Sequence, residues 1–220
     1  MNRPLLAALL AAALLPLAAL AQTPLAAPGK PGWTQAGNDC FVWNRAPAPE
    51  ETASWSGACI NKRASGRGVL LWRAGEAEQR YEGEMRDGHL NGRGKYVFSV
   101  NTSYEGDFKD DDFDGKGVMS EPGVRYEGAW KAGRKNGRGV LSTMNGDRYD
   151  GDFADDAMTG RGVLVLSDGR KYDGALKDGL PEGQGTLTDP AGSVTGAWKA
   201  GCFNDGKNKV AFGVSPSACP

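Results

Sequence analysis

Short runs of alternating apolar and polar residues recur along most of this 220-residue chain, at intervals of about 23 residues. In the segment Tyr126–Trp130, the first and fifth residues are aromatic, the third is glycine and the second is acidic. Side chains of a strand point alternately to its two faces, so this segment predicts a strand with one apolar face. A second apolar run such as Val163–Leu166 follows, and turn residues such as Asp168–Gly169 end it. Each copy therefore predicts two strands and a tight turn.

The repeat also indicates how the copies are arranged. Counting each copy from the aromatic residue of its Tyr-x-Gly triplet as position 0, glycine recurs at positions 2, 11 and 13. Interior glycines cost a helix roughly 1 kcal/mol each, which excludes a helical array. We expect an all-β fold, an elongated single-layer antiparallel meander in which each copy forms a strand, a glycine-rich loop, a second strand and a turn. The copies begin at Tyr81, Tyr104, Tyr126, Tyr149 and Tyr172, with a divergent copy at Trp55 and a truncated one at Val194.

Large apolar side chains flank the glycine at position 2 of each copy. This glycine leaves a slot for a ring, so we interpret it as a packing requirement. A single sheet covers such a row of side chains only in part, and exposed apolar patches mark association sites. We therefore predict a binding face here; the alternative is that the rings pack onto one another along a curved sheet. The predicted face consists of Tyr81, Met85, Tyr104, Phe108, Tyr126, Trp130, Tyr149, Phe153, Tyr172 and Trp198.

The opposite face of the predicted sheet is charged. Acids recur at positions 1 and 3, as in Glu82 and Glu84, and bases recur at positions 5 and 12, as in Arg86 and Arg93. Exposed ion pairs are worth less than about 1 kcal/mol each, so one interpretation is a solvated surface held by such pairs. The other is a charged ladder that recognises a linear polymer or a partner chain.

The N-terminal residues have the layout of a secretory signal. Arg3 precedes an apolar run from Leu5 to Leu20, and Ala19-Leu20-Ala21 supplies an A-x-A cleavage site before Gln22. We predict a signal peptide over residues 1–21 and a secreted, periplasmic mature chain; an uncleaved anchor is the alternative. Without Arg3, 25 of the 26 Lys and Arg residues remain against 27 Asp and Glu. This balance gives no field that would attract nucleic acid.

The four cysteines lie in two local pairs near the ends of the repeats. In an oxidising compartment we expect the disulfides Cys40–Cys59 and Cys202–Cys219, although four cysteines allow three connectivities. Such bonds would close the terminal copies, which a repeat array requires. The spacing within each pair does not fit a zinc site.

One segment matches a calcium-loop pattern. Asp110, Asp112, Asp114 and Glu121 stand at the spacing D-x-[DN]-x-[DN]-G-x5-E, with Gly115 at the glycine position. The flanking residues predict strands and not the helices of an EF-hand, and the repeat already accounts for the glycine. Two interpretations stay open: a calcium site at a hairpin loop, with these four acids as ligands, or a chance match to the calcium-loop pattern. No other cofactor is expected.

The chain offers few groups for catalysis. His89 is the single histidine, so we expect no Ser-His-Asp, Cys-His or histidine-based zinc site, and its loop position predicts surface exposure. Acids recur in every copy, whereas an active site requires one unusual environment. We expect no enzymatic activity; the alternative is an envelope enzyme that uses carboxylates of the repeat face.

The pattern Tyr-x-Gly-x4-Gly-x3-Gly-x-Gly is complete in Tyr81–Gly94, Tyr126–Gly139 and Tyr172–Gly185, and it resembles the MORN repeat. Asp111 and Asp156 depart from it, because each replaces the glycine at position 7. The resemblance implies an elongated, twisted sheet with a groove that serves protein association, sometimes at membranes, and it implies no shared catalytic activity.

The resulting domain prediction divides the chain into four parts. After the signal peptide come a linker and N-terminal cap over 22–54, about seven repeats over 55–206 and a C-terminal cap over 207–220. The function we expect is that of a non-enzymatic scaffold that binds a protein. A calcium-dependent protein that binds polysaccharide or lipid headgroups is the alternative.

Overall fold

The computed structural model describes residues 31–37, 39–47 and 49–219. The predicted signal peptide lies outside these residues, as does the start of the predicted linker. The chain forms two compact units. We call residues 31–122 with 130–133 the N-terminal unit, and residues 123–129 with 134–219 the C-terminal unit. Each unit is described separately below.

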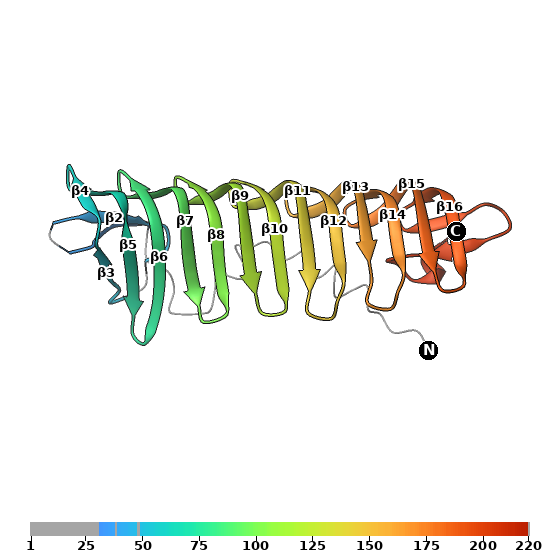
Figure 1. Cartoon of the computed structure of the whole chain (residues 1–220), viewed down its shortest axis with the longest axis horizontal. Coiled ribbons are helices and arrows are strands. Elements are labelled where there is room, and N and C mark those ends of the chain that lie inside the picture. The colour runs from blue at the N-terminus through green and yellow to red at the C-terminus, as the bar shows by residue number, and fades with distance from the viewer. Residues whose placement is uncertain (1–30, 38, 48, 220) are drawn as a thin grey trace. The chain divides into compact units, whose positions relative to one another are not determined.

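The N-terminal unit is built from antiparallel hairpins of neighbouring strands (Figure 1). A short parallel pairing of Phe41 with Arg63 joins part of the cap to the repeats. Its strands are β1 (Gly32–Gln35), β2 (Phe41–Asn44), β3 (Thr52–Trp55), β4 (Ala58–Ile60), β5 (Arg63–Ala74), β6 (Ala77–Arg86), β7 (His89–Ser99), β8 (Thr102–Lys109) and β9 (Asp112–Glu121).

The C-terminal unit continues the same plan in the described residues, with antiparallel pairing from β11 to β18. Strand β10 (Val124–Lys131) is divided between the two units. The other elements are β11 (Arg134–Thr143), β12 (Arg148–Ala154), β13 (Ala157–Val165), β14 (Lys171–Lys177), β15 (Leu180–Asp189), β16 (Gly192–Lys199), β17 (Cys202–Asn204), β18 (Lys209–Ala211) and the short 3-10 helix η1 (Pro216–Ala218). The all-β meander predicted from the repeat is confirmed within each unit.

The predicted glycine-rich loop is wrong. The turn inside each copy falls at positions 6 and 7, where both residues have positive φ, as in Asp87 (51°) and Gly88 (82°). The second strand starts at position 8 and runs through the glycines at positions 11 and 13. These glycines accommodate a register shift, as after Gly83 in the pairing of β6 with β7. A pair of left-handed residues closes a two-residue hairpin, so no longer loop is needed.

Successive copies are fastened by a repeated backbone hydrogen bond. The N–H group at position 7 donates to the carbonyl group at position 9 of the preceding copy. Because the donor belongs to the turn and the acceptor to a neighbouring strand, each turn is held against the copy before it. These bonds are Gly88 to Ala64 (2.9 Å), Asp111 to Leu90 (3.1 Å), Gly133 to Phe113 (2.9 Å), Asp156 to Lys135 (3.0 Å), Gly179 to Met158 (2.9 Å) and Gly201 to Pro181 (2.9 Å).

The tyrosines at position 0 form the centre of the core. The Tyr149 ring lies against Gly151 and Gly162, where an added Cβ would collide with it. Its hydroxyl group donates to the carbonyl oxygen of Asp152 at 3.0 Å, which satisfies the one polar atom of the ring. The slot predicted beside the glycine at position 2 is therefore confirmed. The same hydroxyl-to-carbonyl bond recurs in Tyr81, Tyr104, Tyr126 and Tyr172.

Candidate functional site

The aromatic row predicted as a binding face lies in the interior. Its members have exposed fractions between 0 and 4%. They pack against one another: the Phe153 ring stands edge-on between Tyr126 and Tyr149, with centroids 5.0 and 5.2 Å away. The prediction of an open face is corrected, because these rings shield each other. The residues concerned are Tyr81, Met85, Tyr104, Phe108, Tyr126, Trp130, Tyr149, Phe153, Tyr172 and Trp198.

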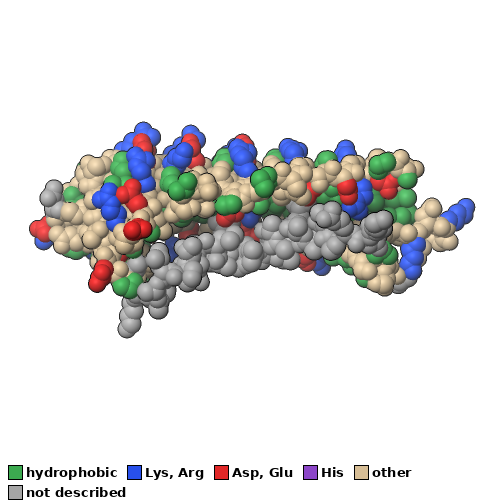
Figure 2. Space-filling view, turned by 90° about the horizontal axis from the view of Figure 1, so that it is seen from below, with side chains coloured by type: hydrophobic (Ala, Val, Ile, Leu, Met, Phe, Trp, Pro, Cys, Tyr) green, Lys and Arg blue, Asp and Glu red, His purple; other side chains and the backbone are tan. Residues whose placement is uncertain are grey.

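The opposite, outer face of the sheet carries the charged residues. Figure 2 shows Lys and Arg side chains in successive clusters, with Asp and Glu side chains among them. In the C-terminal unit, Arg138 lies directly across from Asp152 and its guanidinium is 3.2 Å from Asp150. The Arg138 side chain is 66% exposed, so such a pair contributes less than about 1 kcal/mol. The acids and bases of the repeat thus form a solvated network of ion pairs.

Valines interrupt the charges of this outer face. Val163 lies opposite Asp150 on one side and Asp173 on the other, and Val140 also pairs with Asp150. Residues directly opposite each other share a face, so these valines stand among the charged side chains. Val165 on the same strand is 37% exposed. The outer face of the C-terminal unit is therefore mixed, with apolar side chains between ionised ones.

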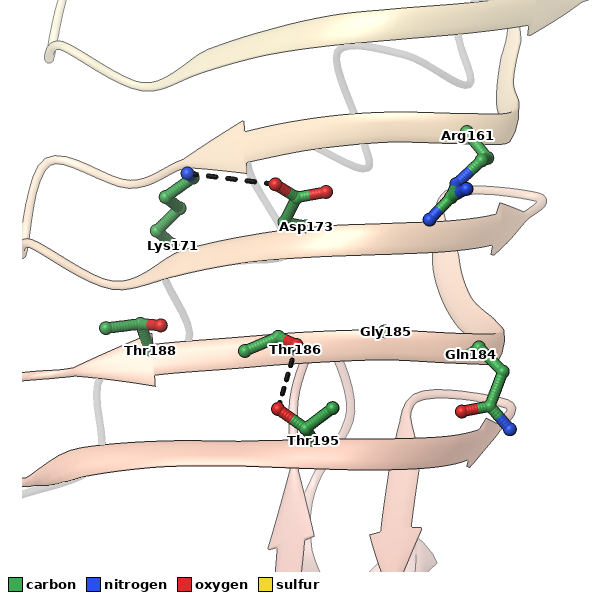
Figure 3. A pocket seen from close by; sticks show the side chains of 8 residues that line it. All are labelled: Arg161, Lys171, Asp173, Gln184, Gly185, Thr186, Thr188 and Thr195. Carbon is green, nitrogen blue, oxygen red and sulfur yellow. Dashed lines mark hydrogen bonds and ion pairs between the residues drawn. The ribbon is translucent and has the colours of Figure 1, made fainter.

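A shallow pocket of about 380 Å³ opens on the outer face of the C-terminal unit (Figure 3). Its lining comes from four adjacent strands, β13 to β16, whose register brings the side chains together. The lining is polar and combines cations, one carboxylate, an amide and hydroxyl groups. The residues that line it are Arg161, Lys171, Asp173, Gln184, Gly185, Thr186, Thr188 and Thr195.

One hydrogen bond across the strands and one ion pair within β14 order the pocket. The hydroxyl groups of Thr186 and Thr195 lie 2.9 Å apart, and Lys171 Nζ is 3.8 Å from Asp173 Oδ2 (Figure 3). Arg161 is fixed at its backbone, where its N–H group donates to Asp152 Oδ2 at 3.2 Å. The arrangement offers donors and acceptors for a polar ligand.

The four acids of the calcium pattern are engaged separately. Asp110 Oδ1 lies 3.5 Å from the Arg86 guanidinium, and Asp112 Oδ1 lies 2.7 Å from that of Arg45. Asp114 accepts from the backbone N–H group of Ala132 at 3.2 Å. Glu121 is the last residue of β9, at the opposite end of this ten-residue strand from the turn at Asp110 and Asp111. Within the described ranges, no three Asp, Glu, His or Cys residues form a cluster that could hold a metal ion.

His89 lies at the edge of the N-terminal cap and not on an open loop. Its Nδ1 is 2.6 Å from Asp111 Oδ2, and its side chain is 29% exposed. The ring centroid lies 5.4 Å from that of Trp33 and 5.8 Å from that of Trp43. The guanidinium of Arg63 lies over the Trp33 ring, 3.2 Å from its centroid. The prediction of simple surface exposure is corrected, because β1 and β2 fold over the ring.

The perturbed pKa values belong to the core and the turns. Burial raises the pKa of Tyr81, Tyr126 and Tyr149 and raises that of Tyr172 to about 12. The hydrogen bond from Arg170 lowers the pKa of the Asp168 carboxyl in its turn. At neutral pH these tyrosines stay protonated and the aspartate stays ionised. The tyrosine shifts follow from burial and the aspartate shift follows from the hydrogen bond, and none of these groups lines the pocket.

Both predicted disulfides are present. Cys40 is bonded to Cys59 and Cys202 to Cys219, with Cα atoms 5.8 and 5.5 Å apart. The first joins the residues before β2 to β4, and the second joins β17 to the residue after η1. Disulfides are typical of proteins that fold in an oxidising compartment.

The sequence interpretation missed two features of the C-terminal unit. One is the hydroxyl-rich pocket. A comparison of the copies could have found it, because Thr186 and Thr188 occupy positions 14 and 16, where the preceding copy has Val163 and Val165. The other is Lys135, which is buried at a position where other copies have an apolar residue. A lysine in the sequence predicts an exposed side chain, so the burial of Lys135 could not be predicted.

Comparison with known proteins gives one family. The MORN repeat model matches residues 81–103, 104–120, 126–148, 149–169 and 172–194. The predicted copies at Trp55 and Val194 lie outside or at the end of these matches. No curated protein matches the chain. Among the residues that the structure describes, no helix has the length and apolar character needed to cross a membrane.

Proposed function

We propose, from the premise that this chain belongs to the MORN repeat family, that it is a non-enzymatic scaffold that binds a protein partner through the outer face of its C-terminal unit. The partner we envisage carries acidic groups that meet the bases at position 12 and basic groups that meet the acids at position 1. Strands β11 to β14 supply this surface.

The observation that carries the proposal is the mixture of charges with valines on that face, of which Val140 and Val163 are half-buried and Val165 is exposed. Val165 is 37% exposed beside Lys171 and Arg148, its partners on the neighbouring strands. Apolar side chains within a polar surface are the composition of a non-obligate protein interface. Charge complementarity then sets register and association rate.

Short turns keep this face accessible. The connections between β11 and β12 and between β13 and β14 consist of residues 144–147 and 166–170. The side chains of neighbouring strands therefore stand at the regular spacing that the sheet sets. An extended or flat protein segment with a matching charge pattern fits this spacing.

The compartment we propose is the periplasm or another oxidising space outside the cytoplasm. Two disulfides support an oxidising compartment, and the leader pattern of residues 1–21 supports export. An oxidising space also suits a binding module whose two end caps depend on disulfides.

Photocrosslinking in the native envelope tests the proposal. A photoreactive residue at Val163 should give one discrete crosslinked protein, and the yield should fall as the salt concentration rises. The same group at Lys207, in the exposed turn after β17, serves as the position control. Arg138→Glu should remove most of the crosslink from Val163, because it reverses a charge of the face.

Equal labelling from Val163 and Lys207 would refute docking at this face. A crosslink that persists in high salt and with Arg138→Glu would also refute it. Recovery of the chain from the cytoplasm with its cysteines reduced would overturn the proposed compartment.

A further inference from the structure

At the hairpin of β15 and β16, the outer face changes from charged and apolar residues to uncharged polar ones. In the preceding copy, β13 carries Arg161, Val163 and Val165 at positions 12, 14 and 16. One copy earlier, β11 carries Arg138, Val140 and Ser142 at these positions. In β15 the same positions are occupied by uncharged polar residues. These residues are Gln184, Thr186 and Thr188, and they face Ala197, Thr195 and Ser193 of β16.

The hydroxyl groups form two neighbouring cross-strand pairs between β15 and β16. Thr186 and Thr195 lie opposite each other with their oxygens 2.9 Å apart, and Ser193 Oγ donates to Thr188 Oγ1 at 3.0 Å. Successive pairs on one face are separated by two residues, roughly 7 Å along the strand. A hydroxyl group has one donor and two acceptor sites, so each pair keeps sites for a ligand.

Cations border this patch on the side of β13 and β14. Arg161 and Lys171 carry two positive charges and Asp173 carries one negative charge, which leaves one net positive charge in the pocket lining. Lys171 contacts Asp173 at 3.8 Å, and within the described chain no ion pair is formed by the Arg161 guanidinium. Arg161 is therefore the group most ready to meet an anion.

We propose that this pocket binds a uronic acid unit, a sugar that carries one carboxylate and several hydroxyl groups. The carboxylate lies against Arg161, and the sugar hydroxyls exchange hydrogen bonds with Thr186, Gln184 and Asp173. The volume of about 380 Å³ lies near the lower end of the roughly 300–1,000 Å³ of small-molecule pockets.

The composition of the pocket favours a sugar acid over two related ligands. Asp173 stands between the cations in the close-up view, so it opposes a doubly charged phosphate while it accepts from sugar hydroxyls (Figure 3). The lining residues that the structure describes include no aromatic ring on which a neutral sugar could stack. Affinity must therefore come from the carboxylate and the hydroxyl groups together.

This inference does not depend on the protein partner proposed above. Titration calorimetry of the purified, disulfide-bonded chain at low salt tests it, with trigalacturonate as the probe and the neutral trisaccharide galactotriose as the ligand control. We expect heat of binding with the acidic trisaccharide alone. Galacturonate itself should bind with about the same affinity as the trisaccharide, because one sugar unit fills the site.

Two substitutions copy residues from other repeats, so both suit the fold. Arg161→Gln reproduces Gln184 and should weaken binding roughly tenfold, the size of a lost charge-assisted contact. Thr186→Val reproduces Val163 and should weaken it severalfold. Arg138→Gln makes the same change at the same repeat position outside the pocket and should leave the affinity within about twofold.

Four results would overturn the proposal. They are an absence of heat with the acidic trisaccharide, equal binding of galactotriose, tighter binding of inorganic phosphate than of trigalacturonate, and equal effects of Arg161→Gln and Arg138→Gln. Circular dichroism of each variant confirms that the comparison is made between folded proteins.

Discussion

The carboxylate of Asp156 holds Lys135 at two points. Asp156 Oδ1 accepts from the backbone N–H group of Lys135 at 3.0 Å and lies 3.6 Å from Lys135 Nζ. The side chain of Lys135 is 7% exposed and that of Asp156 is 11% exposed. Asp156 has a φ of 73°, a conformation for which four other copies use glycine at this position: Gly88, Gly133, Gly179 and Gly201. Its extra hydrogen bond, which glycine could not make, offsets the cost of that conformation.

Asp156→Gly should therefore destabilise the protein although it restores the repeat pattern. The substitution leaves a buried ammonium group without its carboxylate, and we expect the free energy of unfolding to fall by about 3 kcal/mol. Urea denaturation followed by tryptophan fluorescence measures the change. An unchanged or higher midpoint would show that the left-handed strain outweighs the ion pair.

Adding Lys135→Met to Asp156→Gly supplies the control. Met158 occupies the equivalent position of the next copy, so the double variant reproduces a natural combination of the chain. Its stability should return to within about 1 kcal/mol of the original protein, because an apolar pair often replaces a buried ion pair without loss. If the double variant stays as unstable as Asp156→Gly, the lysine charge is not the cause.

Much of the architecture could be predicted from the sequence. The glycines at fixed spacing and the alternation around Tyr126 predict strands, and the local cysteine pairs predict the two end disulfides, one of three possible connectivities. The position of the turn could not be predicted in this way. Asp87 and Gly88 close the hairpin, but a reader of the sequence sees the later Gly92 and Gly94 as the stronger turn signal. The strand tolerates Gly94 because the Tyr81 ring fills the space beside it, and Gly92 supplies the positive φ of 62° at the register shift.

The candidate site was harder to predict, because it depends on cross-strand register. Phe108 and Trp130 look exposed in a flat sheet, yet Phe113 stacks on Tyr104 and closes over them. The letters from Asp110 to Glu121 fit a calcium loop, but the strand geometry turns these acids toward different partners. A linear pattern records spacing along the chain and not which residues meet across strands.

Calcium should accordingly leave the protein unchanged. The acids of the predicted metal site lie in separate contacts, and a calcium ion requires six to eight oxygen ligands around one point. We expect no heat of binding and no shift of the melting temperature at millimolar calcium. A magnesium sample controls for ionic strength. A calcium-specific rise that disappears with Asp112→Asn would restore the metal interpretation.

Gly162→Ala should destabilise the C-terminal unit by crowding a core ring. An added Cβ would lie 2.6 Å from Cζ of Tyr149, closer than real side chains approach. Overpacking of this kind costs about 2 kcal/mol. Gly169→Ala is the control, because its Cβ meets nothing within 4 Å although its φ is 89°. Urea midpoints should rank Gly162→Ala below Gly169→Ala, and the reverse order would contradict the slot.

Removing the C-terminal disulfide should loosen the end of the array. Cys202 and Cys219 are 17 residues apart in sequence, and a loop of this size corresponds to about 3 kcal/mol of stabilisation. We expect the Cys202→Ser, Cys219→Ser double variant to lose that amount in urea denaturation. Its hydrogen exchange should rise first in β17 and β18. Equal exchange across the whole C-terminal unit would show that the bond does not act as an end cap.

The core tyrosines predict a loss of stability at alkaline pH. Burial raises the pKa of Tyr172 to about 12, from an ordinary value near 10, so the folded protein keeps a proton that the unfolded chain releases. The stabilisation from this difference is complete below about pH 10 and is lost as the pH rises through the folded-state pKa. Tyr81, Tyr126 and Tyr149 shift in the same direction and add to the effect. Phenolate absorbance should therefore stay low until the protein unfolds, whereas the chain in concentrated urea should titrate near pH 10. A folded protein that ionises these tyrosines at pH 10 would contradict their burial and, with it, the packing of the rings onto one another.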